Sequence, residues 1–163
     1  MTRNTLLKAL CEFCQARTSD LQLPTSIQKG DTEQEVRAPE VYRMRLPDSS
    51  AAKKVAPYIL LQFVSGVDKQ PHGNAAESTA LVRFIFCVYS ADEQEGAEML
   101  LNVMDAVRIG LLKQGIIGKQ FKLDYDAGLE SLVYADDTAP YYAGEMVATF
   151  LAPPVEREVN LHG

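Results

Sequence analysis

The chain has 163 residues, of which 47% are hydrophobic and 23% charged, and its formal net charge is −6. These values are typical of a soluble domain and exclude a disordered or fibrous chain. The negative charge disfavours direct binding to nucleic acid or to anionic membranes, because both repel it. The length predicts one domain over residues 1–163, whose hydrophobic core needs neither a metal nor a disulfide.

The ends and the cysteines favour a cytoplasmic protein. The N-terminus has no apolar run typical of a signal peptide, and no stretch of about 18 apolar residues predicts a membrane-spanning helix. Three cysteines are an odd number for a disulfide framework. Cys11 and Cys14 have CxxC spacing, but a redox pair of this kind starts a helix that follows a strand. This pair falls inside a predicted helix, so we interpret both cysteines as packing residues.

The first third of the chain predicts one helix and little else. Residues 3–17 place leucines and Phe13 at helical spacing, with charged residues opposite, which indicates an amphipathic helix. Residues 18–40 contain prolines, a glycine and many polar residues, so we expect a long polar loop with little regular structure. A short strand is expected at residues 41–46, followed by a loop over residues 48–54.

The middle of the chain predicts a pair of strands, over residues 58–64 and 79–89, joined by a polar loop over residues 68–77. The even positions of the second strand are all apolar: Val82, Phe84, Phe86 and Val88. Its odd positions are mostly apolar as well, and a sheet that is apolar on both faces must be covered on both. We expect a helix on one face, and either the N-terminal helix or a neighbouring subunit on the other.

A second helix follows the strand pair. Ser90 and Asp92 with the acidic residues after them indicate its start, and Gly115 indicates its end. Residues 121–125 and 129–134 predict one interrupted strand, and residues 144–151 predict a final strand.

The last residues, 155–163, are polar, and we expect a flexible C-terminal tail. The predicted order is helix, short strand, two strands, helix, two strands. This order predicts an α+β fold with a single, largely antiparallel sheet flanked by helices.

Residues suited to catalysis are sparse. His72 and His162 have no Cys, Asp or Glu at ligand or relay spacing, so we expect solvated side chains. Glycines at residues 110–118 lack phosphate-loop spacing and close a helix rather than open one. An acidic group is formed by Asp124, Asp126, Glu130, Asp136 and Asp137. It lacks the alternating ligands of a calcium loop, although a divalent ion between subunits stays an open alternative. We therefore expect no catalytic residues, no metal and no cofactor.

Tyr141 and Tyr142 stand at the start of the last predicted strand. Strand alternation sends their rings to opposite faces of the sheet. Tyrosine is enriched at protein interfaces, so the pair favours a protein contact. Cover of the core edge is an equally good interpretation.

Three stretches of the chain form a distinctive succession: residues 58–63, residues 84–86 before Asp92-Glu93, and residues 140–146 with residues 152–158. This succession resembles a family of small proteins encoded in the tail-morphogenesis region of tailed phages and prophages. Over residues 57–158 the chain is similar to tail terminators, or tail-completion proteins, of the phage lambda type.

The resemblance implies a structural protein without catalytic activity. Tail terminators form a ring, typically a hexamer, that caps the tail tube, stops its growth and meets the head connector. The implied partners are further copies of the chain, the major tail tube protein and the head–tail connector protein. The implied location is the host cytoplasm and then the virion.

For such a role we expect six contact residues: Tyr141, Tyr142, Glu145, Pro153, Pro154 and His72. One alternative is another neck, head-completion or tail-tube protein. A more distant alternative is a small cytosolic enzyme or ligand-binding domain.

Overall fold

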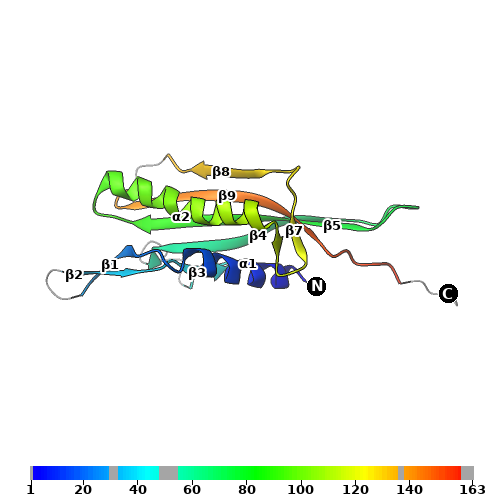
Figure 1. The fold of residues 1–163 in the computed structure, drawn as a ribbon, viewed down its shortest axis with the longest axis horizontal. Coiled ribbons are helices and arrows are strands. Elements are labelled where there is room, and N and C mark those ends of the chain that lie inside the picture. Colours follow the sequence, from blue (N-terminus) through cyan, green and yellow to red (C-terminus); the bar gives the residue numbers. More distant parts are fainter. Residues whose placement is uncertain (1, 30–32, 48–54, 136–137, 159–163) are drawn as a thin grey trace.

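A computed structural model describes residues 2–29, 33–47, 55–135 and 138–158 of the chain (Figure 1). The helices are α1 (Arg3–Thr18) and α2 (Glu93–Gln114). The strands are β1 (Leu23–Lys29), β2 (Glu33–Arg37), β3 (Glu40–Arg43), β4 (Tyr58–Lys69), β5 (Glu77–Tyr89), β6 (Ile116–Ile117), β7 (Phe121–Leu123), β8 (Leu129–Val133) and β9 (Tyr141–Ala152). The fold is α+β with a mostly antiparallel sheet, which confirms the predicted class.

Within the described residues, the main sheet has seven strands in the order β3-β4-β5-β9-β7-β6, and β8 also pairs with β9. Its centre is the antiparallel set β4, β5 and β9, whereas β3 runs parallel to β4. The short strands β7 and β8 both pair with β9, where Leu123 is opposite Phe150 and Leu129 is opposite Ala148. They lie in line along one side of β9, which confirms the predicted interrupted strand.

The ends of α2 follow the sequence signals. The Asp92 carboxylate accepts hydrogen bonds from the amides of Gln94 and Glu95, at 2.9 and 3.0 Å. This is the role of an N-cap residue, which satisfies amides that have no partner inside the helix. At the other end, Gly115 adopts a positive φ of 72° and its amide donates to the Leu111 carbonyl. A residue without a Cβ suits this left-handed conformation, so the helix ends there.

Both helices lie on one face of the sheet and contact each other there. The contact is close at Gly110 of α2, because a Cβ atom built at Gly110 would lie 2.9 Å from the Phe13 ring of α1. The core between helices and sheet includes Leu6, Leu10, Phe84, Phe86, Val107 and Phe150, each almost fully buried. α1 therefore does not cover the second face of the sheet, and that part of the expectation is wrong.

Residues 18–40 are not a structureless loop, because β1 and β2 form an antiparallel hairpin there. Leu23 and Thr25 are buried at its base, and the Arg37 guanidinium donates to the carbonyls of Val55 and Pro57, at 2.7 and 3.0 Å. The hairpin is thus held by residues distant in sequence. Local composition, with its prolines and polar residues, did not predict these contacts.

Other boundaries differ by smaller amounts. β4 continues to Lys69 instead of ending at residue 64, because an irregularity in pairing between Phe63 and Ser65 interrupts the alternation without ending the strand. β3 occupies Glu40–Arg43, so it begins one residue before the expected segment 41–46 and ends three residues short of its end. The expected loop at residues 48–54 lies outside the described residues. Neither helix in the described part combines the length and hydropathy needed to span a lipid bilayer.

Candidate interaction surface

The sheet face turned away from the helices is only partly covered by the described residues. At one end, Leu46, Val55 and Ala56 from the β3–β4 connection pack near Tyr58 and Cys87. Further along, the outward side chains of β5 and β9 are half-buried. We define these side chains as the open face: Thr79, Leu81, Arg83, Ile85, Glu145, Val147, Thr149 and Leu151. Half of them are apolar, which agrees with the predicted surplus of apolar strand positions.

The open face contains a small polar network. Nε of Arg83 donates to Oε2 of Glu145 at 3.2 Å, and the two side chains are 40% and 21% exposed. Burial, followed by the nearby Glu145 carboxylate and a hydrogen bond to it, raises the pKa of Tyr134 above its usual value. Tyr134 therefore keeps its proton at neutral pH. Glu145, a predicted contact residue, joins side chains from β5, β9 and the end of β8.

β8 forms an exposed edge of the sheet. It lies at the upper margin of the molecule, and among the described strands it pairs with β9 alone (Figure 1). Leu132 is 58% exposed, Val133 46% and Tyr134 37%. Exposed apolar residues on an unpaired edge are typical of a place where another chain adds a strand. The sequence predicted a strand here, but not that it would lie at an edge.

The opposite edge of the sheet, β3, is protected. α1 packs beside β3, and the Cys11 thiol lies 3.8 Å from the Val41 carbonyl in hydrogen-bonding geometry. The CxxC motif thus lies in α1, as expected. Burial raises the pKa of the Cys14 thiol far above its usual value, so Cys14 stays a neutral packing group.

Tyr141 and Tyr142 lie beside the β8 edge. Together with Val133 and Tyr134 they line a pocket of about 180 Å³. Their rings face opposite sides of the sheet, as predicted: Tyr141 packs edge-to-face on Tyr89 at 5.4 Å, and Tyr142 packs against the core. The two residues therefore serve packing and also border the exposed edge.

The remaining predicted contact residues lie at the other end of the sheet. His72 is exposed in the turn between β4 and β5. Pro153 is half-buried and Pro154 is exposed, in the extended segment after β9. Gln70 next to the turn donates to the Val155 carbonyl at 2.7 Å, which joins the turn to this segment. The structure thus divides the six predicted residues into two groups, with Tyr141, Tyr142 and Glu145 toward the β8 end of β9.

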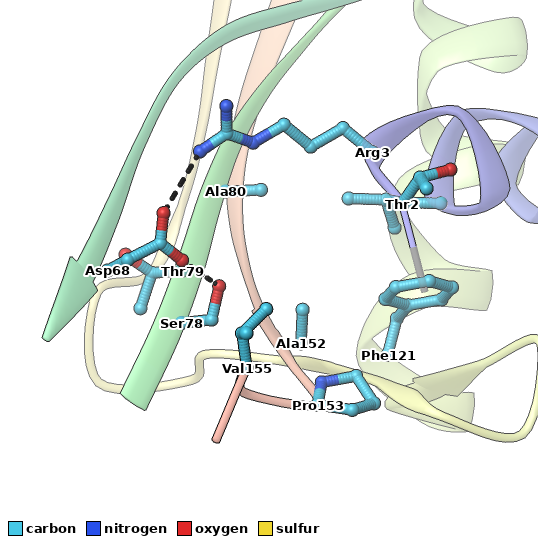
Figure 2. Close-up of a pocket in the computed structure, with 11 residues that line it drawn as sticks. Thr2, Arg3, Asp68, Ser78, Thr79, Ala80, Phe121, Ala152, Pro153 and Val155 are labelled. Carbon is cyan, nitrogen blue, oxygen red and sulfur yellow. Dashed lines mark hydrogen bonds and ion pairs between the residues drawn. The ribbon is translucent and has the colours of Figure 1, made fainter. Parts of the chain in front are cut away.

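A pocket of about 310 Å³ lies where α1 begins, between the β4–β5 hairpin and the C-terminal segment (Figure 2). Arg3 reaches across it to Asp68, with Nη2 and Oδ2 3.4 Å apart. The other Asp68 oxygen accepts a hydrogen bond from Ser78 at 2.6 Å. Asp68 thus pairs with both Arg3 and Ser78 at the wall of this pocket.

A larger and more open pocket, about 460 Å³, lies between α1 and β3. Its lining includes three cationic side chains, from Lys8, Arg43 and Arg45, all exposed. This basic pocket contrasts with the net charge of −6. The three cations make this pocket a candidate site for an anion.

Of the acidic group, Asp124 has a structural role. The Asp124 carboxylate accepts hydrogen bonds from the amides of Asp126 and Ala127, at 3.1 and 3.2 Å, and so shapes the turn between β7 and β8. Within the described ranges, no three His, Cys, Asp or Glu side chains are placed to hold a metal ion. Asp136, Asp137 and His162 lie outside those ranges.

No protein-family model matches the chain, and no curated protein matches its sequence.

Proposed function

We propose that the chain is a structural protein of virion assembly in a tailed phage or prophage. In particular, we propose a tail terminator, which forms a ring, typically a hexamer, on the end of the tail tube. The ring stops tube growth and presents a surface to the head–tail connector protein. The observation that supports this most is a sheet with an exposed apolar edge at β8 and an incompletely covered second face.

A ring of identical subunits needs two different surfaces on each subunit, because its contacts run head to tail. The described surface is strongly asymmetric in this respect. The β8 edge of the sheet is exposed, while the β3 edge is shielded by α1. The β4–β5 hairpin and the C-terminal segment project from one end of the body along its long axis, and the β1–β2 hairpin lies at the other end (Figure 1). These projections suit contacts with neighbouring subunits and with the tube.

The charge of the chain supports protein partners over DNA. A net charge of −6 opposes binding to a phosphate backbone. We propose further copies of the chain, the major tail tube protein and the head–tail connector protein as partners. In this proposal the protein acts without a cofactor and catalyses no reaction.

Electron microscopy tests the proposal directly. The purified protein is mixed with assembling tube subunits from the same phage or prophage. We expect rings at tube ends and shorter tubes as the protein concentration rises. Absence of end binding at every ionic strength tested would contradict the proposal, whatever the protein does alone.

A tail-tube or neck protein is the nearest alternative. Mass measured by light scattering against protein concentration separates these roles. A terminator reaches one plateau mass, whereas a tube subunit continues to grow into filaments. The neighbouring genes offer a second check, since we expect a major tail protein, a tape measure and a connector among them.

The basic pocket between α1 and β3 favours a second class, a ligand-binding domain for an anion. A thermal-shift screen with phosphate, nucleotides and divalent metals tests it. A stabilisation of several degrees by one anion, lost in Arg43→Gln but kept in Arg17→Gln, would favour this class over the tail terminator.

A further inference from the structure

Among the described residues, no strand pairs with the outer side of β8. The Tyr134 amide donates to the Ala143 carbonyl of β9 at 3.1 Å. Since direction alternates along an antiparallel strand, Leu132 and Glu130 also face β9. The amides and carbonyls of Leu129, Ser131 and Val133 then face outward. This five-residue edge carries neither proline nor lysine, the residues that commonly prevent strand addition.

A candidate donor strand belongs to the chain itself. After β9 ends at Ala152, the chain continues through Pro153 and Pro154 as an extended segment, exposed from Pro154 to Glu158. The segment departs from the end of β9 that lies beyond Ala148, where β8 pairing stops, and it continues away from the body (Figure 1). It therefore leads away from its own β8.

The sequence of this segment has the alternation of an edge strand. Its odd positions are Val155, Arg157, Val159 and Leu161, and its even positions are Glu156, Glu158, Asn160 and His162. One side is thus mainly apolar with a single cation, and the other is polar. Residues 159–163 lie outside the described part, so this step uses their sequence alone.

We propose that the outer edge of β8 binds the C-terminal segment, residues 155–161, of a second copy of this chain as an added parallel strand. The proposal rests on the proposed ring, because a head-to-tail contact of this kind either closes into a ring or grows without limit.

One register brings complementary side chains together. With Arg157 beside Glu130, a parallel strand places Val159 beside Leu132 and Leu161 beside Tyr134. The same starting pair in antiparallel orientation places Pro154 beside the outward-facing Val133, where its missing amide removes a hydrogen bond from the ladder. A slip by one residue puts a glutamate of the donor beside Glu130 and reverses the faces. The parallel register is therefore preferred.

Proline at Ser131 tests the acceptor edge. Its amide faces outward, so Ser131→Pro removes a donor for the incoming strand without removing a hydrogen bond to β9. Ser131→Ala keeps the amide and is the matched control. By light scattering, we expect the wild type and Ser131→Ala to associate, and Ser131→Pro to lose association by tenfold or more. Circular dichroism and thermal melting of all three confirm that the fold is retained.

A charge exchange tests the partner segment and the register. Glu130→Arg and Arg157→Glu each place like charges together, and we expect each to weaken association several-fold. The double variant restores the pair in reversed order, so we expect association to return toward the wild-type value. Glu158→Arg, on the other side of the donor, is a control that the register predicts to have a smaller effect.

Three results would overturn this inference. The first is a wild-type protein that stays monomeric at the highest attainable concentration. The second is association that Ser131→Pro leaves unchanged. The third is association that Ser131→Pro abolishes but Arg157→Glu leaves unchanged. If a protein that shows any of these results still caps tube ends, the proposed function stands and the strand contact at β8 is wrong. If the protein associates through the strand contact at β8 but does not cap tube ends, the strand contact stands and the proposed function is wrong.

Discussion

Nε of Arg83 on β5 lies 3.2 Å from Oε2 of Glu145 on β9, across the open face of the sheet. Glu145 is directly opposite Ile85 in the strand register, so Arg83 reaches it diagonally. The ion pair places two charged groups on the open face, which a partner would have to match.

A double-mutant cycle measures that pair. Because both side chains are partly exposed, we expect Arg83→Met and Glu145→Gln to show a coupling of about 0.2–1 kcal/mol in the free energy of urea unfolding. The coupling should shrink as salt is added. A coupling that is independent of salt would contradict a solvent-accessible pair.

Gly96 of α2 gives a sharper prediction, because a Cβ atom there would collide with the Tyr142 ring. Glycine to alanine inside a helix normally stabilises by about 0.5–1 kcal/mol. We expect Gly96→Ala to destabilise the wild type instead, since the half-buried Tyr142 ring has to move.

The same substitution in a Tyr142→Ala background is the control. With the ring absent, we expect Gly96→Ala to be neutral or stabilising in urea unfolding. Equal effects in both backgrounds would show that the ring does not limit this position, and that Tyr142 is placed differently.

Arg37 anchors the β1–β2 hairpin with donor groups directed at three carbonyls, those of Ala38, Val55 and Pro57. Lysine keeps the charge but lacks the planar fork. We expect Arg37→Lys to lower the free energy of unfolding by about 1–3 kcal/mol, and to speed amide exchange in β1 and β2. Arg45→Lys, at an exposed position, should change stability by less than about 0.5 kcal/mol. Similar losses in the two variants would contradict the anchoring role.

Alkaline pH should destabilise the fold through Tyr58 and Cys14. Burial, and for Tyr58 also the contact with Cys87, raises the pKa of both groups above the ordinary values of 10.0 and 9.0. The unfolded chain releases these protons at lower pH than the folded chain does. Stability is therefore complete below about pH 9 and falls as pH rises further.

Urea unfolding between about pH 8 and pH 11 measures this loss. We expect Tyr58→Phe to flatten the dependence, because phenylalanine has no proton to release. Tyr125→Phe, at a half-exposed position, is the matched control and should keep the wild-type slope. A wild-type slope in Tyr58→Phe would contradict the assignment.

The sequence by itself determined the elements whose signals are local. Apolar spacing gave α1, alternation gave the core of β5, and Asp92 with Gly115 defined the ends of α2. The opposite orientation of Tyr141 and Tyr142 followed from strand geometry alone. The alternation along residues 79–89 also showed that both faces of the sheet carry apolar side chains, more than the helices on one face can cover.

Tertiary structure alone decided how these elements share surfaces. α1 was free, by sequence, to cover either face, and it joined α2 because residues such as Gly110 let the helices approach closely. The β1–β2 hairpin is tied to the rest of the fold by Arg37, whose guanidinium donates to carbonyls 18 and 20 residues further along the chain. Edge position is likewise a property of strand order, so nothing in Leu129–Val133 marked β8 as exposed. Local patterns fix which residues need cover, and only packing between distant segments decides which of them remain uncovered.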